Sequence, residues 1–163
     1  MRRVWLSLGL LCLVAPVAGA QTKLSGAGQC AKPDPAHQVD VGDRPQHAFS
    51  IGKVKCTWSK PFEIAGIQSK GGTAVQFDEL SDKGSRFHGY FLDEMANGDT
   101  ARYRYEGKAT LKAGMPPSTE WEWKLVGGTG KLKDVKGKGT CRGTGNPDGS
   151  GAWECVGEYK LEK

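Results

Sequence analysis

Residues 118–126 read STEWEWKLV, and their side chains alternate between two chemical kinds. Trp121, Trp123 and Leu125 fall on one face of an extended chain, and charged residues occupy the positions between them. Successive side chains of a β-strand point to opposite faces of its sheet, so the pattern predicts a strand with one buried and one solvated face. Antiparallel sheets permit such two-faced strands.

The same alternation continues in both directions along the chain. Residues 100–111 (TARYRYEGKATL) and 152–161 (AWECVGEYKL) each carry one apolar face. The inward residues expected from these two segments are Ala101, Tyr103, Tyr105, Ala109, Leu111, Trp153, Cys155, Tyr159 and Leu161. Further strands are expected at residues 47–58, 62–68, 73–80, 85–95 and 134–144. Asn97-Gly98 is a hairpin turn signal between two of them.

This pattern predicts an all-β protein of about eight consecutive strands with short connections. A single antiparallel up-and-down β-barrel is the favoured architecture, because closure removes exposed sheet edges. A β-sandwich is the alternative that the pattern leaves open. No segment shows a helical period, and no linker is long enough to divide the chain.

The first residues have the composition of an export signal. Arg2 and Arg3 precede an apolar run at residues 4–17, and small residues at 18–20 form a cleavage site. We interpret residues 1–20 as a signal peptide, since the run is too short to span a bilayer comfortably. Leu11 before Cys12 argues against a lipid-modified cysteine. The protein is therefore expected in the periplasm or outside the cell, without stable membrane insertion.

Removing the two arginines lowers the formal net charge from +5 to +3. This mildly basic balance is far from the signature of a nucleic-acid-binding protein, so no nucleic-acid partner is expected. Residues 21–44 are polar and are broken by Pro33 and Pro35. They predict an extended N-terminal arm rather than a helix, with the barrel domain spanning residues 45–163.

Four cysteines lie beyond the signal peptide. Their number in an exported chain favours two disulfides, and the spacing lacks the close pairs of a zinc site, so no metal is expected. Centring the GNPDGSG turn on Asp148 sets Cys141 opposite Cys155 and large rings opposite glycines. We predict Cys141–Cys155, which leaves Cys30–Cys56 to fasten the arm. The alternative is that the cysteines link other strands.

Residues 123–140 (WKLVGGTGKLKDVKGKGT) are rich in glycine and lysine. They fail as a phosphate-binding loop, because Leu132 stands where the motif needs Ser or Thr and no helix follows. They lack the aromatic residues that single-strand binders interleave with positive charge. We interpret the lysines as a solvated strand face and Gly127, Gly128 and Gly130 as a bend.

Residues 126–132 (VGGTGKL), followed by Gly137, are similar to the GGTG segment of the allene oxide cyclase and dirigent proteins. The clear similarity covers residues 120–143. The resemblance implies a secreted or plastid eight-stranded barrel with an apolar lumen. No catalytic residue of these families has a counterpart that we can place on this chain, so none is carried over.

The barrel interpretation gives an aromatic lumen, whose rings either form a ligand pocket or fill the core; a filled core with a pocket at one mouth is favoured. The residues expected to bind a ligand there are Tyr103, Tyr105, Trp121, Trp123, Trp153, Tyr159 and His88. Glu63, Glu79 and Glu94 are conceivable general acids, and none is singled out. His37 and His47, with Asp40 and Asp43, form a conceivable metal-binding segment that we interpret as a polar loop. No cofactor and no catalytic residue is assigned.

Three functions remain open at this point. The favoured one is non-catalytic binding of a small apolar or aromatic ligand. The second is an isomerase or cyclase of the allene oxide cyclase kind, as the resemblance implies. The third is a structural protein whose basic outer face docks onto an anionic envelope surface. A ligand retained after gentle purification favours the first two.

Overall fold

The computed structural model describes residues 21–112 and 117–161; the expected signal peptide at residues 1–20 lies outside these ranges. The strands are β1 (Thr22–Cys30), β2 (Ala36–Asp40), β3 (Ala48–Lys60), β4 (Glu63–Ile64), β5 (Ile67–Ser81), β6 (Gly84–Met95), β7 (Thr100–Thr110), β8 (Ser118–Gly128), β9 (Val135–Gly145) and β10 (Gly151–Leu161). A 3-10 turn, η1 (Gly130–Leu132), joins β8 to β9. In the described ranges no helix is long and apolar enough to cross a membrane.

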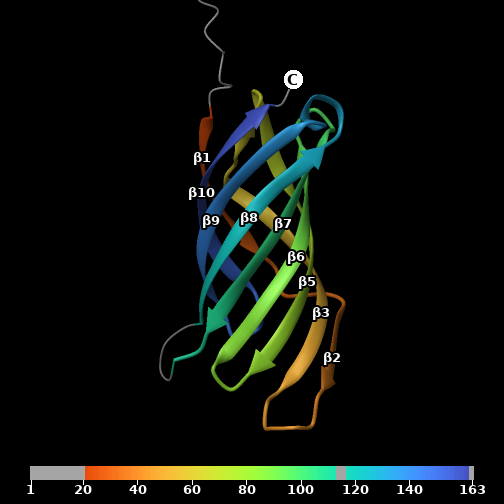
Figure 1. The fold of residues 1–163 in the computed structure, drawn as a ribbon, viewed down its shortest axis with the longest axis vertical. Coiled ribbons are helices and arrows are strands. Elements are labelled where there is room, and N and C mark those ends of the chain that lie inside the picture. The colour runs from red at the N-terminus through yellow and green to blue at the C-terminus, as the bar shows by residue number, and fades with distance from the viewer. Residues whose placement is uncertain (1–20, 113–116, 162–163) are drawn as a thin grey trace, which may run out of the picture.

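The strands close into one antiparallel barrel (Figure 1). Eight of them pair in the order β3, β1, β10, β9, β8, β7, β6, β5, and β5 returns to pair with β3. The short strands β2 and β4 are extra, β2 beside β3 and β4 beside β5. The structure therefore confirms the barrel rather than the β-sandwich. Strands β7 to β10 follow each other around the wall, as expected for an up-and-down order.

The segment before residue 45 is extended, but its first part does not lie outside the barrel. β1 pairs with β10 along its whole length and with β3 at its end, so it is one of the eight wall strands. Residues 62–68, expected to be a strand, instead form the β4 hairpin and the start of β5. The wall therefore has the expected eight strands, but β1 takes the place expected for a strand at residues 62–68.

Glycines explain why β1 fits this place and why its pattern is weak. Its inward positions include Gly26 and Gly28. A Cβ atom at Gly26 would stand 2.8 Å from ring atoms of both Phe62 and Trp58, and one at Gly28 would collide with Trp153. The strand therefore has glycines where aromatic rings from β3, β10 and the β3–β4 link approach its backbone.

One end of the barrel is closed by the β4 hairpin. Phe62 and Ile64 are fully enclosed, and Ile64 has no exposed surface. The hairpin is fixed from the opposite wall, because the Ala65 backbone N–H donates to the hydroxyl of Tyr159 at 2.9 Å. Burial of these aliphatic and aromatic side chains gives the fold a dry core at this end.

Both expected disulfides are present, Cys30–Cys56 and Cys141–Cys155. The predicted register of the last hairpin is also confirmed, with Cys155 opposite Cys141 and Trp153 opposite Gly143. The Cα atoms of this cysteine pair are 4.1 Å apart. The disulfides thus join β1 to β3 and β9 to β10, and both face the barrel interior.

The GGTG segment is a bend, as its glycines indicate. Gly127 and Gly130 have positive φ angles of 124° and 49°, which side chains other than glycine rarely adopt. The Thr129 hydroxyl accepts the Thr100 backbone N–H at 2.9 Å and donates to Asp99 at 3.2 Å. The segment is therefore tied to the turn between β6 and β7, and it is followed by the short 3-10 turn η1 and then by β9, not by an α-helix.

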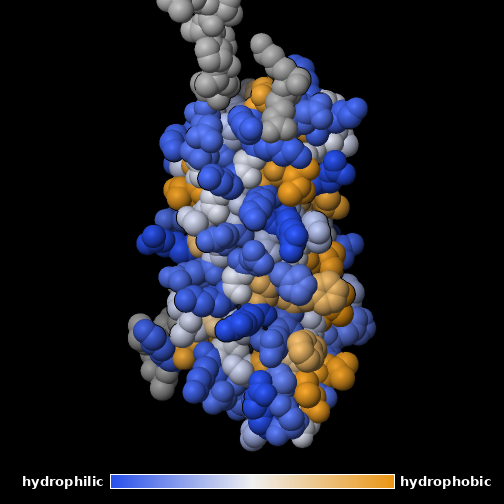
Figure 2. All heavy atoms as spheres, in the orientation of Figure 1, coloured by the Kyte–Doolittle hydropathy of each residue, from blue (hydrophilic) through white to orange (hydrophobic). Residues whose placement is uncertain are grey.

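The face of the molecule drawn in Figure 2 is mostly hydrophilic. Lysines of residues 131–138 are exposed, as expected for a solvated face. Hydrophobic residues gather on one side, where Figure 2 shows them over the region of β3 and β5. The largest exposed ones on these two strands are Phe49, Ile51, Val75 and Phe77.

Candidate functional site: a ring-lined cavity in the barrel

The barrel interior contains a cavity of about 240 Å³ to which all eight wall strands contribute. Pro33, Gly149 and Ser150 lie at its mouth, in the loops that follow β1 and precede β10. Phe62 lies at the opposite, plugged end. The lumen is therefore neither completely filled nor a pore, but a pocket that opens at one mouth.

Aromatic rings form a large part of the cavity wall. All four tryptophans of the described ranges line it: Trp58, Trp121, Trp123 and Trp153. The Trp58 ring stands edge-on to Trp153 with centroids 4.7 Å apart, and 4.6 Å separates it from Phe62. Edge-to-face and tilted ring contacts of this kind are favourable and geometrically specific. They make a stiff wall against which a flat ligand can pack.

Glycines on β9, which pairs with β8, and on β10, the next strand along the wall, leave room for the ring of Trp123. A Cβ atom at Gly139 or at Gly157 would collide with the Trp123 ring. Both glycines face it from neighbouring positions on β9 and β10, where they are cross-strand partners. The glycine positions of the last two strands therefore shape the cavity wall.

One buried carboxyl group lies next to the cavity. Asp93, on β6, has no exposed surface, and its Oδ1 accepts the Trp58 Nε1–H at 3.0 Å. Burial raises the pKa of Asp93 from 3.8 to about 6, although the Ser69 hydroxyl, the Trp58 N–H and the Gly71 amide act against the rise. Asp93 is not itself a lining residue, so it reaches the cavity only through the Trp58 indole.

Three buried polar atoms have no hydrogen-bond partner among the described residues. One is Asp93 Oδ2, and the other two are the Tyr103 hydroxyl and Trp123 Nε1. Both aromatic residues line the cavity and are 4% exposed. Burial, together with the negative charge of Asp93, raises the pKa of Tyr103 well above its usual value, so the phenol is protonated and available as a donor.

A second polar group of residues is fully connected. The Tyr105 hydroxyl donates to Gln76 Oε1 at 3.1 Å, and Gln76 Nε2 donates to Asp78 Oδ1 at 2.9 Å. Burial raises the pKa of Asp78, against hydrogen bonds from Gln76, Ser50 and Ser85. Burial and the Asp78 charge also raise the pKa of Tyr105. Gln76 and Tyr105 line the cavity, whereas Asp78 does not.

As far as the described residues form it, the cavity wall carries no side chain that is charged at neutral pH. Among the described residues that line it, none is Asp, Glu, His, Lys or Arg. The lining is aromatic, aliphatic, disulfide and a few neutral polar groups such as Gln76 and Thr119. Such a wall fits an uncharged molecule, because a buried ion without a partner is costly.

Of the seven residues expected in the lumen, five line the cavity, Tyr159 lies at the plugged end, and His88 lies outside. Tyr103, Tyr105, Trp121, Trp123 and Trp153 line the cavity. Tyr159 is buried, but it belongs to the plugged end and holds Ala65 rather than lining the cavity.

His88 lies on the outer face, which corrects its expected place in the lumen. It is exposed and stacks on Phe77 with centroids 5.4 Å apart. The alternation of β6 explains the difference, since Phe87, Phe91 and Asp93 take the inward positions.

The acids considered from the sequence are not in the site. Glu63, Glu79 and Glu94 are all exposed. Asp93, which sequence reasoning missed, is the buried acid of β6. A signal existed, because Asp93 has the same parity as Phe91 and Met95 and therefore had to share their inward face.

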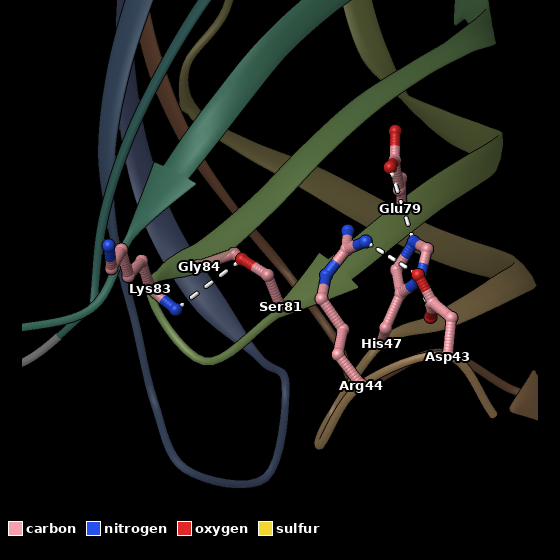
Figure 3. A network of polar contacts seen from close by, with 7 residues as sticks. All are labelled: Asp43, Arg44, His47, Glu79, Ser81, Lys83 and Gly84. Atoms are coloured by element: carbon pink, nitrogen blue, oxygen red, sulfur yellow. Dashed lines mark hydrogen bonds and ion pairs between the residues drawn. The ribbon is translucent and has the colours of Figure 1, made fainter. Parts of the chain in front are cut away.

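His47 belongs to a separate polar group on the outside of the barrel (Figure 3). Its Nδ1 contacts Asp43 in the β2–β3 loop, and its Nε2 lies 3.3 Å from Glu79 on β5. Interaction with His47 lowers the pKa of Asp43. His37 is exposed on β2. In the described part of the chain no group of three or more His, Cys, Asp or Glu side chains is arranged to hold a metal ion.

Comparisons with known proteins give similarity of fold only. No family model matches the chain, and no curated protein matches it in sequence. Among solved structures, the chain is similar to the pterocarpan synthase dirigent protein GePTS1, with a TM-score of 0.50 and 12% sequence identity. The match covers 88% of this chain and 87% of that one. The protein thus has the barrel fold of a dirigent protein.

Proposed function

We propose that this protein is an exported binding barrel that holds one small, uncharged, largely apolar molecule in its lumen. The observation that carries the proposal is the ring-lined cavity of about 240 Å³ with an open mouth and an uncharged wall. An apolar cavity of about 150 Å³ is large enough to bind benzene. The larger volume here suits a molecule of two fused rings.

The two disulfides support an oxidising compartment as the place of action, either the periplasm or the space outside the cell. The signal peptide interpretation of residues 1–20 agrees with this location. Mass spectrometry of the exported protein tests it, because cleavage before Gln21 gives a defined N-terminal peptide. An intact N-terminus after export contradicts the interpretation.

Binding is best tested with an uncharged two-ring probe. We expect tetralin to bind the oxidised protein with one site and a Kd between about 1 and 100 µM, from the usual binding free energy per ligand atom. Isothermal titration calorimetry measures this directly. All four cavity tryptophans provide a second readout, since a ligand among them changes their fluorescence.

A filling substitution and a matched control locate the probe. Ala74 is buried on the inward face of β5 and lines the cavity, whereas Val75 is the next residue and points outward. Ala74→Phe should weaken tetralin binding at least about tenfold by occupying the space, while Val75→Phe should leave it unchanged. Absence of binding to the wild type, or equal binding by Ala74→Phe, refutes the proposal.

A second candidate is an isomerase or cyclase that uses the lumen to fold its substrate. Asp93 supports it, as a buried acid with a raised pKa beside the cavity wall. Binding is the stronger proposal, because Asp93 does not line the cavity. If a natural ligand recovered by native mass spectrometry is converted by the wild type but not by Asp93→Asn, the second candidate replaces the first.

A further inference from the structure

The inner part of the cavity has two hydrogen-bond donors without acceptors. The Tyr103 hydroxyl and Trp123 Nε1 have no partner among the described residues, and both side chains are 96% removed from solvent. A buried polar group without a partner costs free energy, and such groups are rare in native proteins. Neither donor is bonded to a described residue, so each can donate to a group that enters the cavity.

The two donors lie close together. Tyr103 and Trp123 are on the neighbouring strands β7 and β8, with ring centroids 5.7 Å apart in an edge-on arrangement. Trp123 also lies 5.7 Å from Phe62, which belongs to the plug. The two rings therefore share one part of the cavity wall. Their donor atoms have almost no accessible surface, so an acceptor that enters between the rings reaches both donors only after a small shift of the rings.

Three of the four other ring donors of the wall are already occupied, and the fourth, on Trp121, belongs to a side chain that is only half-buried. Trp58 donates to Asp93, Tyr105 donates to Gln76, and Trp153 Nε1 donates to the sulfur of Cys30 at 3.2 Å. The unsatisfied pair is therefore a local feature of Tyr103 and Trp123, not a general property of the lining.

We infer that the lumenal ligand carries one neutral acceptor oxygen, of the carbonyl kind, which binds between Tyr103 and Trp123. This inference rests on the proposed function and specifies the ligand of the same cavity. Two donors match the two lone pairs of a carbonyl oxygen. An anionic group is disfavoured, because Asp93 is close enough to Tyr103 for its charge to act on the phenol and the wall holds no cation. The acceptor must also be slim, since both donor atoms lie at the buried edges of their rings.

The test uses two ligands that differ only in the oxygen, tetralin and 1-tetralone. Without hydrogen bonds the ketone should bind more weakly than the hydrocarbon, since its carbonyl loses water. With both donors available we expect 1-tetralone to bind the wild type at least as tightly as tetralin. Tyr103→Phe and Trp123→Phe should each lower the affinity for 1-tetralone, relative to that for tetralin, about fivefold or more.

Tyr105→Phe is the matched control. It removes a hydroxyl from the same wall, but one that is already bonded to Gln76. In Tyr105→Phe the ratio of the Kd of 1-tetralone to the Kd of tetralin should therefore stay at its wild-type value. A ratio that changes equally in Tyr105→Phe and Tyr103→Phe overturns the inference.

The infrared spectrum of bound 1-tetralone gives a readout that needs no variant. Hydrogen bonding should shift its carbonyl stretch to lower wavenumber than in hexane. An unshifted band, or variants that weaken both ligands alike, overturns the inference while leaving the proposed function intact. Failure of both ligands to bind the wild type refutes the proposed function instead, so the two failures are distinguishable.

Discussion

The Trp58 indole donates its Nε1–H to Oδ1 of Asp93 at 3.0 Å, which joins β3 to β6 through the barrel interior. The carboxyl group has no exposed surface, and its second oxygen makes no hydrogen bond of normal geometry with the described residues, although the Ser69 hydroxyl and the Gly71 amide are near enough to act on the group. The contact fixes one ring of the cavity wall. It also places an acid where its negative charge is poorly solvated, so it should affect stability as well as geometry.

Replacement of this acid should stabilise the protein. Asp93→Asn keeps an oxygen that can accept the Trp58 N–H and removes the buried charge. We expect the free energy of unfolding at pH 7.5 to rise by about 1–3 kcal/mol, because a pKa about two units above normal corresponds to roughly 3 kcal/mol. Urea unfolding measures this. Glu94→Gln, on the exposed face of the same strand, is the control and should change stability little.

The contribution of Asp93 should also depend on pH with a defined sign. Its pKa in the folded protein is about 6, above the usual 3.8, so folding favours the protonated form. The stability that protonation of Asp93 gives the folded state is fully present below about pH 4 and is lost as the pH rises through 6. The stability difference between Asp93→Asn and the wild type should therefore grow across this range. A difference that is constant from pH 4 to 8 contradicts the assignment.

The disulfides should contribute similar amounts of stability. Cys30–Cys56 and Cys141–Cys155 are separated by 26 and 14 residues. Loops of these lengths correspond to about 3–4 kcal/mol of unfolded-state entropy, slightly more for the longer one. Paired serine substitutions of either disulfide should lower the free energy of unfolding by about that amount in denaturant titrations. Loss of less than about 1 kcal/mol for both pairs would contradict this expectation.

The glycine facing the Trp123 ring should tolerate no side chain. A Cβ atom at Gly157 would collide with that ring and with the carbonyl oxygen of Lys138. Gly157→Ala should therefore cost about 1–3 kcal/mol or more and weaken tetralin binding, because the ring must move. Gly145→Ala is the control, since its Cβ would stand an ordinary 3.5 Å from Pro117. Thermal unfolding with and without tetralin compares the two variants.

The fold could be predicted largely from alternation and turn residues. The last hairpin shows why, because the GNPDGSG turn fixes its register and therefore both the cysteine pairing and the positions of Trp153 and Gly143. β1 could not be recognised in the same way. Its inward positions include Gly26 and Gly28, whose absent side chains are explained only by rings that come from distant parts of the chain.

The site could be predicted only in part. The in-out alternation of side chains was enough to identify the inward rings of β7 and β8, since those strands are regular where the cavity forms. Alternation gives the face of the sheet but not the position along the barrel axis. It therefore could not distinguish Tyr159 at the plugged end from Trp153 in the cavity wall. His88 shares its face of β6 with Arg86 and Tyr90, which points outward, and the same alternation was the signal for Asp93 on the inward face.

The most direct test of a hollow, ligand-binding lumen is a crystal structure of the oxidised protein determined with 1-tetralone and without it. We predict that the bicyclic ligand lies among Trp58, Trp121 and Trp153, in a cavity that exists before the ligand enters. A lumen closed by collapsed rings, with the ligand absent or bound only outside the barrel, would contradict the account.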